Sequence, residues 1–166
     1  MKWSNFHITV NFNVDSEDHL PAMREAIESM VELPFVWWWI KQFDGSERID
    51  FVGDQKQLVD TVRIRAVFEH KGKQNHGLHV HMVVEIGHDT MVQVDKEGVS
   101  EVFRQFVNMQ PNVHVRFVKG SGEDKDFILL YLSKEIPSYK PNNQWNSRLK
   151  SALQNGDDVV EVEASL

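Results

Sequence analysis

The chain has 166 residues, a formal net charge of −7 and no cysteine. A chain of this length can bury one hydrophobic core and is most simply one domain. The missing cysteines exclude disulfides and zinc–thiolate sites, and no apolar run approaches the roughly 18 residues of a membrane span. No signal-peptide pattern opens the chain, so we expect a soluble, intracellular protein without a membrane partner.

Hydrophobic periodicity in the first third of the chain predicts two strands, a helix between them and a loop. The helix carries an apolar stripe formed by Leu20, Met23, Ile27, Met30 and Val31. The second strand holds three consecutive tryptophans. In chain order these elements are a strand at 6–12, a helix at 16–32, a strand at 35–43, and a loop with a short strand at 45–53.

The rest of the chain is predicted to contain a hairpin, two longer helices, another strand and a C-terminal extension. In order, these are a hairpin at 62–87, helices at 95–109 and 124–136 with a strand at 113–118 between them, and the extension at 138–166. We expect the acidic end of the extension to be disordered. Antiparallel strands with flanking helices make an α+β fold with a central antiparallel sheet, whose main domain is 1–137.

The segment 75–85 places two histidines on one strand. Because side chains alternate across a strand, His79 and His81 share one face, while Val80 and Met82 share the other. Two neighbouring imidazoles make half of a divalent-metal site. The alternative is a solvated strand face that merely carries two histidines.

A carboxylate from the preceding strand favours the metal site over that alternative. The run 70–77 can turn the chain back, so that Glu69 lies beside His79 and His81. Two further histidines, His70 and His76, compete for the place of third ligand. In a chain without cysteine, imidazole and carboxylate suit Mn²⁺ or Mg²⁺.

Tyr131 and Lys134 lie three residues apart in the helix at 124–136 and therefore on one helical face. The alternative is a core tyrosine next to a surface lysine. The chain has only one other tyrosine, Tyr139, in a loop flanked by prolines.

Glu69, then His79-Val80-His81, then Tyr131-Leu132-Ser133-Lys134 resembles the HUH endonucleases. The likeness is greatest to the single-tyrosine replication initiators (Rep proteins) of small DNA viruses and rolling-circle replicons. It covers about residues 4–136 and rests on the order and spacing of short motifs. The resemblance implies the HUH-endonuclease fold, which is RRM/ferredoxin-like, over 1–137.

The resemblance also implies an activity. Glu69, His79 and His81 would bind Mn²⁺ or Mg²⁺, Tyr131 would be the nucleophile, and Lys134 would offset the charge of the phosphotyrosine. The protein would nick and rejoin single-stranded DNA at a replication origin or hairpin. The covalent intermediate would be a 5′-phosphotyrosine, and no ATP would be needed.

Departures from the family leave alternatives open. The chain has no Gly-x-x-x-x-Gly-Lys-Ser/Thr, so a helicase would be a further domain or a separate partner. A single-tyrosine HUH transposase usually takes its third ligand from the tyrosine helix, whereas Glu69 precedes the histidines. From another class comes a nucleic-acid-binding module with this fold and no activity. We expect location in the host nucleus for a viral or eukaryotic source, and otherwise in the cytoplasm.

Several other residues could contact DNA. The net charge has the wrong sign for a protein that approaches phosphates, but residues 101–150 hold more Lys and Arg than Asp and Glu. An exposed tryptophan could stack on an unpaired base, although core packing is the simpler role. The candidates are His7, Thr9, Asn11, Lys71, Lys73, His114, Arg116 and Trp38.

Overall fold

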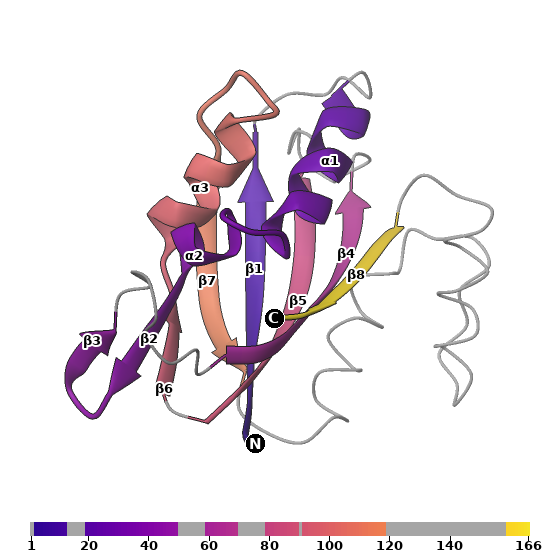
Figure 1. The fold of residues 1–166 in the computed structure, drawn as a ribbon. Helices are drawn as coiled ribbons and strands as arrows, with labels where there is room; N and C mark the ends of the chain where they lie inside the picture. The colour runs from indigo at the N-terminus through magenta and orange to yellow at the C-terminus, as the bar shows by residue number, and fades with distance from the viewer. Residues whose placement is uncertain (1, 13–18, 50–58, 70–78, 90, 119–158) are drawn as a thin grey trace, which may run out of the picture.

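The computed structural model describes residues 2–12, 19–49, 59–69, 79–89, 91–118 and 159–166 (Figure 1). The described strands are β1 (Lys2–Asn11), β2 (Ile40–Asp44), β3 (Glu47–Ile49), β4 (Val59–Glu69), β5 (His79–His88), β6 (Met91–Val94), β7 (Asn112–Val118) and β8 (Val159–Ser165). The described helices are α1 (Leu20–Met30), α2 (Val36–Trp39) and α3 (Lys96–Arg104).

Two antiparallel sheets organise these elements. The larger sheet has the strand order β7-β1-β5-β4-β8, and the smaller has the order β3-β2-β6. All three helices lie on one side of the larger sheet (Figure 1). The expected α+β class with a central antiparallel sheet is therefore confirmed.

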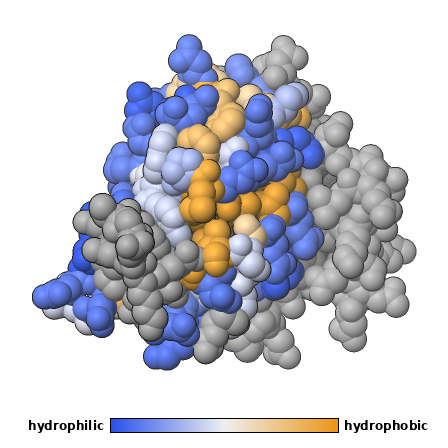
Figure 2. Space-filling model, in the orientation of Figure 1, coloured by the Kyte–Doolittle hydropathy of each residue, from blue (hydrophilic) through white to orange (hydrophobic). Residues whose placement is uncertain are grey.

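The core lies between the helices and the larger sheet. Alternate residues of β1, β4 and β5 point toward the helices and are fully buried, among them Ile8, Val10, Ile64, Val80 and Val84. The apolar stripe predicted for α1 is also buried there. On the helix-bearing side of the molecule, apolar side chains gather in a narrow strip bordered by hydrophilic surface (Figure 2).

The tryptophan segment was wrongly predicted as a continuous strand. Residues 36–39 form the short helix α2, and the strand β2 begins only at Ile40. The helix buries Trp39 completely and lets its indole Nε1 donate a hydrogen bond to the Met30 carbonyl at 3.0 Å. Tertiary packing thus overrides the strand preference of aromatic residues.

The acidic end was also wrongly predicted, because residues 159–165 form β8 instead of a disordered tail. This strand pairs antiparallel with β4 over the register Thr61↔Ser165 to Val67↔Val159. Its apolar residues Val160, Val162 and Ala164 pack on the core, and the intervening Glu161 and Glu163 are exposed.

The remaining predicted elements occur in the described part of the chain with shifted ends, or lie outside it. Helix α3 runs from Lys96 to Arg104 and therefore ends earlier than the predicted 109. Asp95, the predicted first residue, is its N-cap, and its side chain accepts a hydrogen bond from the Glu97 backbone N–H at 3.1 Å. The turn at 70–77, the helix at 124–136 and the first part of the extension lie outside the described residues. No helix in the described part of the chain is long and apolar enough to cross a membrane.

Candidate functional site

The side of the larger sheet opposite the helices carries most of the predicted site residues. Directly paired residues of antiparallel strands project to the same side. His79 pairs with Asn11 on β1 and with Glu69 on β4, and His81 pairs with Thr9 on β1. We call this side the histidine face. Its polar members include His7, Thr9, Asn11, His79, His81, His114 and Arg116.

His81 is held by two side chains of β1. Its Nδ1 lies 3.2 Å from His7 Nε2 and 3.3 Å from Thr9 Oγ1. The His7 and His81 rings are stacked, with centroids 5.4 Å apart and planes inclined by 29°. His79 meets His81 edge to face, with centroids 4.9 Å apart. His7 and the sequence-distant pair His79 and His81 therefore form one contact group.

His7 is neutral in this environment. Burial, together with the nearby charges of His81 and Arg116, lowers its pKa from 6.5 to about 4. A neutral imidazole has one nitrogen that donates a hydrogen bond and one that accepts. The neutral His7 ring can therefore accept a hydrogen bond from His81 without charge repulsion.

The predicted hairpin register is confirmed, because Glu69 lies opposite His79 in the β4–β5 pairing. The side chain of Glu69 lies outside the described part of the structure. Among the described side chains, no group of three His, Asp or Glu residues is arranged to hold a metal ion. Two imidazoles and a carboxylate from the adjacent paired position nevertheless form a donor set that fits Mn²⁺ or Mg²⁺.

The outer strand β7 extends the histidine face with polar groups. His114 pairs with Thr9, and Arg116 pairs with His7. Both side chains are exposed, as the alternation predicted. Arg116 is thus placed one strand from the histidine group, where it could meet a phosphate.

The opposite end of the same face holds an ion-pair network that was not predicted. Glu85 is only 4% exposed and lies 3.4 Å from the guanidinium nitrogens of both Arg63 and Arg65. Arg63 also bonds Glu163 of β8 at 3.1 Å, and this hydrogen bond raises the pKa of Arg63. The β8 partner of Arg63 was hidden by the expectation that the acidic end is disordered.

The structure separates Trp38 from the other described DNA-contact candidates. Its helix lies on the core side of the sheet, and its half-buried ring packs edge to face on Phe35 at 4.8 Å. The open pocket beside it is lined by the acidic residues Asp95, Glu97 and Glu101. This acidic setting does not suit a phosphate chain. Four more predicted site residues lie outside the described part of the chain: Lys71, Lys73, Tyr131 and Lys134.

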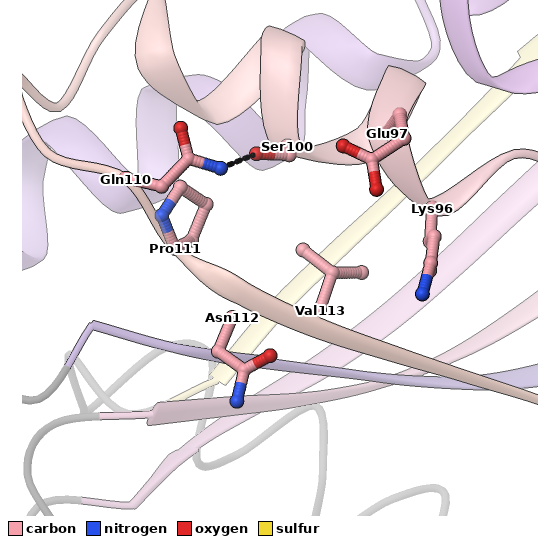
Figure 3. A pocket seen from close by; sticks show the side chains of 7 residues that line it. All are labelled: Lys96, Glu97, Ser100, Gln110, Pro111, Asn112 and Val113. Atoms are coloured by element: carbon pink, nitrogen blue, oxygen red, sulfur yellow. Dashed lines mark hydrogen bonds between the residues drawn. The ribbon is translucent and has the colours of Figure 1, made fainter.

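A cavity of about 180 Å³ opens between the start of α3 and the start of β7 (Figure 3). Its lining is mostly polar, and Gln110 donates a hydrogen bond to the Ser100 hydroxyl at 3.0 Å across one wall. None of the residues predicted for the site lines this cavity. The histidine face is therefore the candidate site, and the cavity is separate from it.

No family model matches this chain, and searches of curated proteins and of solved structures return no match either. Its function is therefore inferred from its own residues and their geometry.

Proposed function

We propose that this protein is a single-tyrosine HUH endonuclease that nicks and rejoins single-stranded DNA, in the manner of a replication initiator. The observation that carries the proposal is the β4–β5 register. It aligns Glu69 with His79 and puts His79 and His81 on one face, as the short motifs require.

The strand order gives independent support. Taken without its insertions, the chain runs β1-α1-β4-β5-α3-β7 and forms a β-α-β-β-α-β unit. In the sheet, the fourth strand of this unit lies beside the first, followed by the third and the second. A ferredoxin-like fold has the same strand order, which supports the proposal, and β8 adds a fifth strand beside β4.

The two ends of the segment that carries the tyrosine are also favourably placed. The chain leaves the sheet at Val118, beside Asn5, and returns at Val159, beside Val67. Val67 is itself the direct partner of His81. The segment that carries Tyr131 therefore returns to the sheet at Val159, which is level with His81 across the strands.

The residues have distinct roles in the proposed reaction. His79, His81 and Glu69 would hold Mn²⁺ or Mg²⁺. When bound, the cation would polarise the scissile phosphate and offset the charge on its nonbridging oxygens. A tyrosine with an ordinary pKa of about 10 is a weak nucleophile at neutral pH, so Tyr131 must lose its proton as it attacks.

The proposed step exchanges one phosphodiester for another. The Tyr131 oxygen forms a bond to phosphorus while the bond from phosphorus to the 3′ oxygen breaks. The 3′ oxygen takes up a proton and leaves as a hydroxyl, and the 5′ end stays on the tyrosine. Lys134 would lie beside this phosphotyrosine. Attack of a 3′-hydroxyl reverses the step and rejoins the strand.

A covalent-adduct assay tests the proposal. The full chain is incubated with pools of labelled single-stranded oligonucleotides and Mn²⁺, and denaturing gels are searched for a protein–DNA adduct. We expect an adduct with the unmodified chain and none with Tyr131→Phe. The matched control is Tyr139→Phe, because it removes the only other tyrosine hydroxyl.

Two results would contradict the proposal. An adduct that persists in Tyr131→Phe and disappears in Tyr139→Phe would identify Tyr139 as the nucleophile instead of Tyr131. DNA binding with no adduct in any metal would instead identify a binding module without nuclease activity.

A further inference from the structure

The contact between His7 and His81 gives His7 a role that the motif pattern does not include. We propose that His7, helped by Thr9, is a positioning residue that fixes the proton of His81 on Nδ1. His81 would thereby offer Nε2 to the metal. This inference rests on the proposed function, because it assumes that His81 is a metal ligand.

The β1 side chains contact one particular nitrogen of His81. Both β1 contacts reach the same atom, Nδ1, at 3.2 Å from His7 Nε2 and 3.3 Å from Thr9 Oγ1. A histidine that binds a metal through one nitrogen is generally oriented by a hydrogen bond from the other. Nδ1 is the oriented nitrogen here, so Nε2 is the nitrogen for the metal.

The hydrogen between the two rings determines the tautomer of His81. His7 Nε2 faces His81 Nδ1 at 3.2 Å, so one of the two nitrogens donates and the other accepts. When His7 Nε2 accepts, the hydrogen between the rings must belong to Nδ1 of His81. The lone pair of His81 then lies on Nε2, which is the form that a metal requires.

The geometry of His7 suits positioning of His81 better than direct binding of the metal. The His7 and His81 rings are stacked face to face, with their planes inclined by 29°. In the described part of the chain, His7, His79 and His81 do not qualify as a three-ligand group. His7 is also fixed on both sides, because it pairs with Val83 on β5 and Arg116 on β7. This placement suits a residue that holds its neighbour still.

The experiment measures the tautomer of His81 directly, without metal or DNA. Long-range proton–nitrogen NMR correlations distinguish the two neutral tautomers of a histidine. The spectra are recorded on the ¹⁵N-labelled full chain at about pH 8, where an imidazole with an ordinary pKa is neutral. The His81 signals are assigned by their loss in His81→Gln.

Three variants make the test specific. His7→Phe keeps an aromatic ring for stacking but removes the acceptor nitrogen. His7→Gln restores an acceptor oxygen at the side-chain end. His19→Phe is the matched control, because His19 lies at the start of α1, on the helix side. Should His7→Phe fail to fold, Thr9→Val removes the second partner of the same Nδ1 atom.

We expect the unmodified chain and His19→Phe to show His81 protonated on Nδ1, and His7→Phe to show a shift toward Nε2–H. By calorimetry, Mn²⁺ affinity should fall about 10–100-fold in His7→Phe and largely recover in His7→Gln. An unchanged His81 tautomer in His7→Phe would overturn the inference. A loss of Mn²⁺ affinity with no tautomer change would make His7 a ligand and also overturn it.

Failure of the proposed function has a different signature. If the unmodified chain binds no Mn²⁺, both the metal site and the positioning role fall. If it binds Mn²⁺ and forms the tyrosine adduct but His7→Phe behaves like the unmodified chain, only the role of His7 is lost.

Discussion

Glu69 and His79 lie directly opposite each other at the end of the β4–β5 pair, one strand apart and on the same side of the sheet. This relationship depends on the register of the hairpin. A slip by one residue would send Glu69 to the core side, because side chains alternate along a strand. The same register keeps Glu69 in the paired position beside His79, two residues from His81 along β5.

Removal of the Glu69 carboxylate should affect the two metals unequally. We expect Glu69→Ala to lose Mg²⁺-supported cleavage more completely than Mn²⁺-supported cleavage. Mg²⁺ strongly prefers oxygen ligands, whereas Mn²⁺ tolerates a site richer in nitrogen. Initial rates of oligonucleotide cleavage in each metal would measure the difference.

The neighbouring histidines provide the controls for this comparison. His70→Ala and His76→Ala should each keep most of the activity in both metals. Inactivity of either variant, together with a Glu69→Ala protein that is active in both metals, would show that a histidine is the third ligand.

The contrast between the hairpin and the tryptophan segment shows what periodicity can predict. In β4 and β5, polar and apolar residues largely alternate, and this pattern assigns Ile64, Val80 and Val84 to the core side. Val67 and Val83 are the exceptions, because they pair with His81 and His7 and so lie on the histidine face. In 36–39 the residues are apolar without alternation, so no period distinguishes strand from helix. Helix α2 is chosen by packing, through the indole of Trp39 and the close approach of α3.

The C-terminal strand was missed for a different reason. Its acidic composition suggested disorder, although Val160, Val162 and Ala164 alternate with Glu161 and Glu163. Period-two alternation was therefore a usable signal, and the Arg63 partner of Glu163 could not be identified without the pairing of β4 and β8. The contact of His7 with His81 was hidden for the same reason, because it depends on the register of β1 with β5.

Protonation of His7 should destabilise the folded protein. The pKa of His7 is about 4 in the folded state and ordinarily 6.5, so between these values the unfolded chain binds more protons. The stability contributed by neutral His7 is complete above about pH 6.5 and is lost as the pH falls toward 4. Urea unfolding midpoints at several pH values would measure this loss.

A variant without a titratable group at this position isolates the effect. His7→Gln should show a weaker decline of the unfolding midpoint between pH 7 and pH 4 than the unmodified chain. His19→Gln, on the helix side, should keep the original decline. Identical pH dependence in His7→Gln and the unmodified chain would show that His7 titrates normally.

Gly98 should tolerate no side chain, although it lies within helix α3. Alanine normally stabilises a helix interior relative to glycine by about 1 kcal/mol. A Cβ on Gly98, however, would lie 2.6 Å from the Trp38 carbonyl carbon and 2.7 Å from the Trp39 Cα. These are backbone atoms, so α2 and α3 would have to move apart. We expect Gly98→Ala to destabilise the protein by about 1–3 kcal/mol, measured by urea unfolding.

The matched comparison for Gly98 is Ser100→Ala in the same helix. Ser100 is buried, and its hydroxyl accepts a hydrogen bond from the neutral amide of Gln110. Loss of this hydrogen bond should lower the free energy of unfolding by about 1 kcal/mol. A Gly98→Ala protein as stable as the unmodified chain would mean that α2 and α3 do not approach as closely as described.

Arg116 should contribute to DNA affinity through a phosphate rather than a base. It is exposed on β7, on the histidine face and opposite His7, whereas Arg104 is exposed on α3 and bonds Glu101 at 2.7 Å. We expect Arg116→Ala to weaken binding of single-stranded oligonucleotides about equally for all sequences. The slope of log affinity against log salt should fall by about 0.7, the value for one phosphate contact on a single strand.

Fluorescence anisotropy over a series of salt concentrations measures both the affinity and the salt slope, and Arg104→Ala should leave them unchanged. A loss of affinity restricted to one DNA sequence would identify a base contact. Equal effects of the two variants would show that DNA does not bind along the histidine face.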